Sequence, residues 1–144
     1  MFNWLKNLFL VKEIKSQAGE LHFQRYRIIE CRLFALYLHY IAKADEDKHM
    51  HSHPWNFYSM ILKGGYIEEI DNPRSFDTVK GRFIFSIGYR FYDTYHKVVT
   101  LCRPTWTLVL TSPKKEDYTW GYLVDGKHVA FDKYRENKNN GMYN

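Results

Sequence analysis

The segment that decides the fold of this chain reads Asp45-Glu-Asp-Lys-His-Met-His-Ser-His-Pro-Trp-Asn-Phe-Tyr-Ser-Met-Ile-Leu-Lys-Gly-Gly-Tyr66. Three of the seven histidines lie in it, at the alternate positions His49, His51 and His53. Alternate side chains of a strand share one face, and the residue before Pro54 is pushed out of the helical region. Two imidazoles on one face can supply half of a metal's coordination shell. The segment therefore predicts a strand that carries part of a metal site.

The rest of the chain reads as short strands separated by turns. Tyrosine and phenylalanine are abundant, at 12 and 10 residues, and both favour strands. Lys63-Gly64-Gly65 predicts a turn that ends the histidine strand, and Arg103-Pro104 predicts a break between two later strands. The expected strands cover residues 21–30, 32–42, 49–62, 66–70, 82–87, 91–101, 105–111, 118–124 and 128–131. This pattern predicts an antiparallel sandwich or barrel.

The two ends of the chain read differently from its middle. Phe2, Leu5, Leu8 and Phe9 recur at helical spacing, which predicts a short amphipathic helix. We expect a single domain over residues 1–144, with the helix and its lead-in over 1–19, a β-barrel over 20–131 and a frayed polar tail over 132–144. The apolar start is too short to cross a bilayer and lacks a cleavage site, so we expect no membrane span and no signal peptide.

Charge and cysteine content narrow the range of partners. The formal net charge is +5, which favours anionic partners such as phosphates or nucleotides. The basic residues are not clustered and no nucleic-acid-binding motif is present, so nucleic acid is not expected as a partner. Cys31 and Cys102 lack metal-type spacing and are expected to be reduced thiols in a cytoplasmic protein.

The histidine segment resembles the first motif of the cupin superfamily, which reads His-x-His, three or four residues, Glu, six residues, Gly. His51-Ser-His53 and Gly65 fit this motif, and Gly81 followed by a strand and a histidine resembles the second motif. The pattern His51-x-His53-Pro-Trp followed by Gly64-Gly65-Tyr-x-Glu is similar to that of small bacterial and phage cupin-like proteins. The resemblance covers most of residues 20–124. It implies an all-β fold, a double-stranded β-helix (the cupin jelly roll), here with the short N-terminal helix.

The resemblance implies a metal site made by His51, His53 and His96. The glutamate of the motif is absent, because Phe57-Tyr58-Ser59 occupies its region, and counting from Gly81 places the last ligand at Tyr92. His96 lies an even number of residues further along, so it stays on the same strand face. Imidazole ligands suit several divalent metals, and iron, zinc, nickel or manganese are all open.

Other residues are candidates for catalysis. Asp93, Tyr58 or water could fill the remaining positions around the metal. Glu68 could reach inward as an acid or base, although a solvated strand edge is the alternative for this residue. Tyr58, Asp93 and Glu68 are therefore the predicted catalytic residues.

A further set of residues is predicted to line a substrate pocket: His39, His49, Trp55, Arg90 and Trp106. The tryptophans could stack on a planar ring or simply pack the barrel, and His39 could equally be a hydrogen-bonded core residue. Arg25, Arg82 and Arg90 could hold an anionic group of a substrate, and the sequence singles out none of them.

Two functions follow as hypotheses. The first is a metal-binding cupin that acts as an enzyme, dioxygenase- or isomerase-like, on a small organic substrate in an aromatic-lined pocket. The second is a non-catalytic cupin that binds a small anionic ligand such as a nucleotide. The resemblance also implies a possible homodimer.

Overall fold

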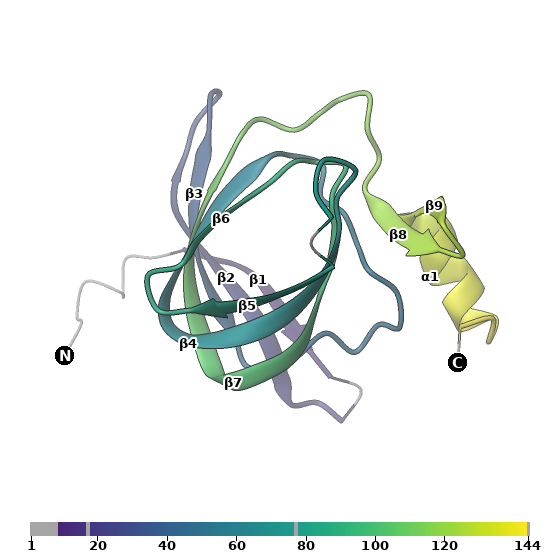
Figure 1. The fold of residues 1–144 in the computed structure, drawn as a ribbon, viewed down its shortest axis with the longest axis horizontal. Helices are drawn as coiled ribbons and strands as arrows, with labels where there is room; N and C mark the ends of the chain where they lie inside the picture. Colours follow the sequence, from purple (N-terminus) through teal and green to yellow (C-terminus); the bar gives the residue numbers. More distant parts are fainter. Residues whose placement is uncertain (1–8, 17, 77, 144) are drawn as a thin grey trace.

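The computed structural model describes residues 9–16, 18–76 and 78–143. Its strands wrap around a common interior, while β8, β9 and α1 lie together at one side (Figure 1). The elements are β1 (Phe9–Lys15), β2 (Leu21–Glu30), β3 (Ala35–Ile41), β4 (Phe57–Asp71), β5 (Val79–Phe83), β6 (Ile87–Arg90), β7 (Tyr95–Thr111), β8 (Gly121–Val124), β9 (Lys127–Ala130) and α1 (Phe131–Asn139). The predicted all-β fold class is confirmed.

All of the strand pairs are antiparallel. The main sheet has the order β1-β2-β3-β7-β4-β5, and β6 pairs with the start of β4. β8 and β9 form a separate hairpin. An isolated bridge from His51 reaches both His96 of β7 and Tyr122 of β8, so the histidine segment connects the hairpin to the main sheet.

β4 and β7 are long strands of 15 and 17 residues that pair along most of their length. The predicted turn at Gly64-Gly65 is a bulge inside β4, and the predicted break at Arg103-Pro104 lies inside β7 opposite that bulge. A bulge bends a strand and changes which residues face inward. The buried side of β4 is accordingly 57, 59 and 61 before the bulge and 66, 68 and 70 after it.

The segment of the alternate histidines is not a regular strand. Apart from the bridge at His51, residues 49–56 have no strand assignment, and the strand begins at Phe57 instead of His49. The backbone of this segment is satisfied elsewhere: Ser52 N–H donates to Gly121 O and Leu123 N–H to Met50 O, both at 2.9 Å. The predicted alternation therefore holds locally without a continuous ladder.

Both ends of the described chain differ from expectation. Residues 9–15 form β1, and the other residues of the predicted N-terminal helix lie outside the described part. At the other end, α1 replaces the first part of the expected frayed tail. Tyr134 is only 2% exposed, and its ring stacks on that of Tyr122 with centroids 3.7 Å apart. Aromatic burial of this kind stabilises a helix whose sequence is otherwise polar.

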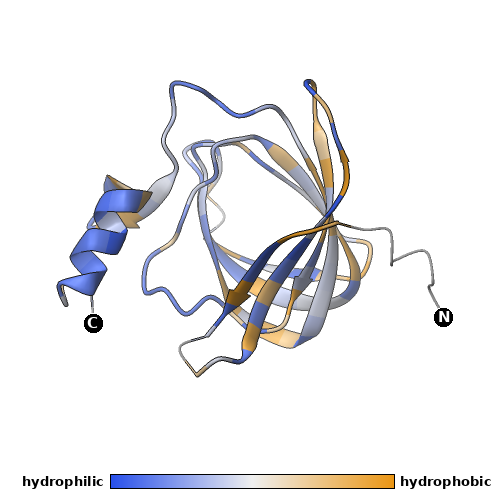
Figure 2. Cartoon of the chain, turned by 180° about the vertical axis from the view of Figure 1, so that it is seen from behind, coloured by the Kyte–Doolittle hydropathy of each residue, from blue (hydrophilic) through white to orange (hydrophobic). Residues whose placement is uncertain are grey.

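The surface and interior differ in polarity. Figure 2 shows that α1 is mostly hydrophilic, while apolar residues are spread along the strands. The apolar core around Ile61, Tyr66 and Val98 is small, and several buried residues are polar, among them Glu68, Arg82, Arg90, Thr105 and Thr107. Among the described residues, no helix is long and apolar enough to span a bilayer.

Candidate metal centre

β7 and the segment before β4 bring three histidines together. His51 and His96 exchange two backbone hydrogen bonds of 2.9 Å, which fixes them side by side. His53 lies two residues further on and points to the same side, whereas Ser52 is fully buried on the other side against Gly121. The predicted grouping of His51, His53 and His96 is thus present in the structure.

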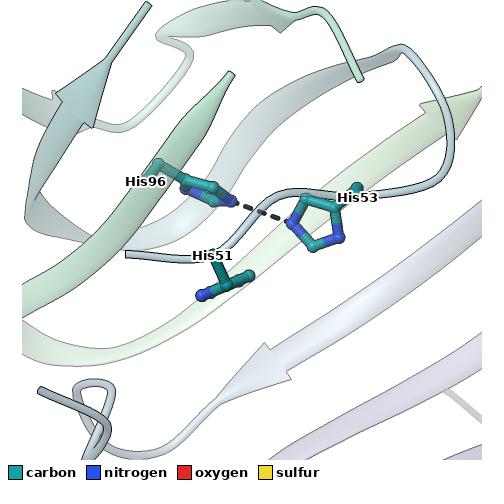
Figure 3. A group of neighbouring side chains, drawn as sticks. All are labelled: His51, His53 and His96. Carbon is teal, nitrogen blue, oxygen red and sulfur yellow. Dashed lines mark hydrogen bonds between the residues drawn. The ribbon is translucent and has the colours of Figure 1, made fainter. Parts of the chain in front are cut away.

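The three rings are close enough to share one ion. One ligand atom from each of His51, His53 and His96 lies within 4.8 Å of the others. The Nε2 atoms of His53 and His96 are 2.9 Å apart (Figure 3). Ring centroids are separated by 4.9–5.1 Å. Three nitrogen ligands with an open side are typical of catalytic metal sites.

Glu68 contacts Nδ1 of His96, the ring nitrogen that does not face His53. Its carboxylate is 3.2 Å from Nδ1 of His96, is 1% exposed, and also forms ion pairs with Arg90 and Arg82. Burial by itself would raise the pKa of Glu68, but the hydrogen bond to His96 and the charges of His96 and the two arginines lower it to about 2. Glu68 is therefore ionised at neutral pH, and the alternative of a solvated strand edge is wrong for it.

The ionised carboxylate fixes the proton on His96. A carboxylate can only accept, so Nδ1 of His96 donates to Glu68, and the other ring nitrogen, Nε2, faces His53. Metal-ligating histidines commonly donate their second nitrogen to a carboxylate in this way. The Nε2 atoms of His53 and His96 face one another at 2.9 Å, and both must be free of protons before they can bind one ion.

Burial keeps the imidazoles of His51 and His53 uncharged at neutral pH. Burial first, and then the charge of His96, lower the pKa of His51 to about 4. Burial and the neighbouring histidines and Arg25 lower the pKa of His53 well below its usual range. Neutral imidazole is the form that binds metals. The three residues therefore fit a divalent transition metal in number and spacing, and His51 and His53 fit it also in protonation.

Two of the predicted catalytic residues do not face this group. Tyr58 is 53% exposed on the side of β4 opposite Phe57, and its ring packs on Tyr89 with centroids 4.5 Å apart. Asp93 forms two hydrogen bonds with Arg74, of 2.6 and 2.9 Å. The structure therefore does not bring either side chain to the histidines. The alternation of β4 turns Tyr58 outward, and the ion pair with Arg74 holds Asp93 at the surface.

Three of the five predicted pocket residues, Trp55, His39 and Arg90, contact the histidine group or a residue beside it. Trp55 stacks beside His53, with centroids 6.2 Å apart and planes at 16°. His39 accepts a hydrogen bond from Arg25, at 2.9 Å. Arg90 lies behind the site, where it is paired with Glu68.

The other two predicted pocket residues lie elsewhere. His49 contacts Tyr134 of α1, with Nδ1 3.0 Å from the hydroxyl. Trp106 packs against Tyr26 and Tyr40. It lies on the opposite face of β7 from the buried Thr105 and Thr107. Neither residue lines the interior around the three histidines, so both pocket assignments are corrected.

The overall arrangement matches solved structures. A RmlC-like cupin from Shewanella frigidimarina aligns with 81% of this chain and 92% of its own, at 12% identity and a TM-score of 0.54. This chain has the cupin fold. A search of protein-family models and of curated proteins gave no match to the sequence.

Two further solved structures have a similar fold. Fe(II) HppE aligns with 77% of this chain and 59% of its own, at 6% identity and a TM-score of 0.59. A chain from the DMSP lyases RdDddP and RnDddQII aligns with 68% of this chain, at 14% identity and a TM-score of 0.55. This chain spans about half, 51%, of that lyase chain.

Proposed function

We propose that this protein is a metal-dependent cupin that binds a divalent transition metal through His51, His53 and His96 and acts on a small organic molecule in the barrel interior. The observation that carries the proposal is the convergence of three imidazoles, one of them hydrogen-bonded to the ionised Glu68. Imidazole ligands suit iron, nickel and zinc, and manganese also stays open. A bound metal would supply Lewis-acid activation of a water or a substrate oxygen.

The residues of the chain would each have a defined task. Glu68 keeps the Nδ1 proton of His96 in place and so directs Nε2 toward the ion. Phe57 contacts the rings of both His53 and His96, with centroids 5.2 and 6.0 Å apart, and excludes water from that side. Trp55 forms the neighbouring wall. Dioxygenase- and isomerase-like reactions both remain hypotheses for this site.

Metal analysis tests the proposal. Purified protein is dialysed against Fe(II), Zn(II), Ni(II) or Mn(II) and then freed of unbound metal, and the bound metal is measured by mass spectrometry. The comparison is with the double variant His51→Ala, His53→Ala, and the control is His128→Ala, which removes an exposed imidazole bonded to Tyr95. We expect about one ion per chain in the wild type and the control and almost none in the double variant. Equal metal content in all three proteins would overturn the proposal.

A homodimer also stays a proposal. The end of β5, the start of β6 and the turn between them expose large apolar side chains, with Phe83 69%, Phe85 74% and Ile87 67% exposed. Exposed apolar patches commonly mark contacts between proteins, which supports a dimer through this segment. Light scattering of the wild type and of Phe85→Ser tests it, and a monomeric wild type would exclude it.

A further inference from the structure

Arg25 is a cation of the barrel interior that has no anionic partner among the described residues. It lies on β2 opposite His39 of β3, and its Nε donates to Nε2 of His39 at 2.9 Å. The two buried arginines near the site, Arg82 and Arg90, share Glu68. In the described ranges no carboxylate pairs with Arg25, and its two Nη groups donate to no protein acceptor.

Aromatic rings hold the guanidinium of Arg25 in place. The rings of Tyr37, Trp55 and Phe23 lie 5.1, 5.6 and 5.8 Å from its central carbon. Such contacts stabilise a cation but supply no hydrogen-bond acceptors. The guanidinium is half-buried and its terminal N–H groups have no acceptor among the described residues, so an anion that reaches them would gain charge-assisted hydrogen bonds.

A second basic residue, Lys12, lies beside Arg25. Lys12 of β1 pairs with Arg25 in the register of the two strands. Partial burial and the charge of Arg25 both lower the pKa of Lys12. His39 accepts from Arg25, so its Nε2 carries no proton and the ring is neutral. Arg25 and Lys12 therefore form a cationic pair with His39 as a positioning residue.

This cationic pair is adjacent to the three histidines. Trp55 joins the two regions, because its ring stacks with His53 and also contacts the guanidinium of Arg25. A small molecule could thus contact Arg25 and the histidine group at the same time.

We propose that Arg25 binds the anionic group of the substrate, a carboxylate or a phosphate, through its two free Nη groups, with Lys12 adding charge and His39 fixing the orientation. The planar guanidinium fork matches such oxyanions in a bidentate arrangement. This inference rests on the proposed function, because it places the remaining part of the substrate at the three-histidine site. It names the substrate class as a small organic anion.

Calorimetric titration of metal-free protein with acetate and with inorganic phosphate tests the anion site. The variants are Arg25→Gln and Arg25→Lys, and the control is Arg27→Gln, which removes an exposed cation of the same strand that pairs with Glu30. We expect at least one of the two anions to bind. The anion that binds more tightly identifies the anionic group of the substrate as a carboxylate or a phosphate. Arg25→Gln should weaken this binding roughly 10-fold or more, because a charge-assisted hydrogen bond is lost, while Arg27→Gln leaves it unchanged.

Metal content of the same variants separates this inference from the proposed function. Arg25→Gln should bind metal like the wild type. Anion binding that depends on Arg25 in a protein that binds no metal would leave the anion site standing and would refute the metal proposal. If Arg25→Gln does not fold, Arg25→Lys decides, since it keeps the charge and loses the fork. Absent anion binding in the wild type, or equal affinity in the wild type and both Arg25 variants, overturns the inference.

Discussion

Glu68 is the single residue on which the candidate site depends most. Its carboxylate accepts from His96 and neutralises Arg82 and Arg90, all within the interior. Removing one member of a buried charge network leaves its partners unpaired, which costs more than the network contributes when complete. The same carboxylate also sets which nitrogen of His96 is free for a metal. Stability and metal affinity should therefore respond together at this position.

The substitution Glu68→Gln should lower the free energy of unfolding of the metal-free protein by about 3–5 kcal/mol. It should also weaken metal binding by roughly 10- to 100-fold, because His96 loses its orienting acceptor. Urea unfolding and a competitive metal titration measure the two effects. Glu69→Gln is the matched control, since Glu69 is exposed on the opposite face of β4. Similar effects of the two substitutions would contradict the role given to Glu68.

At the scale of elements, the bulge in β4 decides whether Glu68 faces inward. Gly64 has a φ of +87°, and a Cβ there would lie 2.5 Å from Thr105 Oγ1 and 2.8 Å from Pro104 O. Before the bulge, β4 turns Phe57, Ser59 and Ile61 inward. After the bulge, it turns the even-numbered residues 66, 68 and 70 inward. Without this shift by one residue, Glu69 would take the inward place.

Gly64→Ala should destabilise the protein by at least about 2 kcal/mol, from backbone strain and from the clash with β7. We also expect weaker metal binding, because a shifted register moves Glu68 away from His96. Thermal unfolding and metal titration check both points. Gly81→Ala is the control, since a Cβ at Gly81 meets nothing within 4 Å and the backbone is unstrained. A Gly64→Ala protein as stable as Gly81→Ala would refute the importance of the bulge.

At the scale of the whole molecule, the interior contains histidines whose protonation differs between the folded protein and the unfolded chain. The pKa of His51 is lowered to about 4 by burial and by His96, and burial also lowers the pKa of His39 and His53. As pH falls below the ordinary value of 6.5, these groups take up protons in the unfolded chain while they stay neutral in the folded protein. Folding stability is therefore lost on acidification.

We expect the unfolding free energy of the metal-free protein to fall between pH 6.5 and about 4, at about 1.4 kcal/mol per pH unit for each proton taken up on unfolding. Urea unfolding at several pH values measures the slope. The double variant His51→Ala, His53→Ala should have a smaller slope over the same range. A wild-type stability that is constant or rises on acidification there would contradict the neutral state of these histidines.

Contacts between residues far apart in the sequence decided those features that the sequence did not predict correctly. The alternate histidines, the glycine offset and His96 were enough to predict the three-histidine group and the all-β fold. Tyr58 and Asp93 were predicted catalytic residues because they lie near the ligands in sequence. A strand face and the distant Arg74 place them elsewhere. The helix α1 was missed because its stability comes from packing on Trp120 and Tyr122, not from its polar sequence.

The sequence by itself determined the fold class and the common face of His51 and His53, because these follow from local alternation, and the cupin resemblance added His96 to the set. Only the tertiary structure decided that Glu68 contacts His96 and that Arg25 is hydrogen-bonded to His39, with no carboxylate partner in the described part of the chain. Both facts depend on strand register. The bulge at Gly64-Gly65 moves Glu68 to the inside, and the pairing of β2 with β3 sets Arg25 against His39. Register between distant strands is fixed by the packing of the whole barrel, which no local pattern contains.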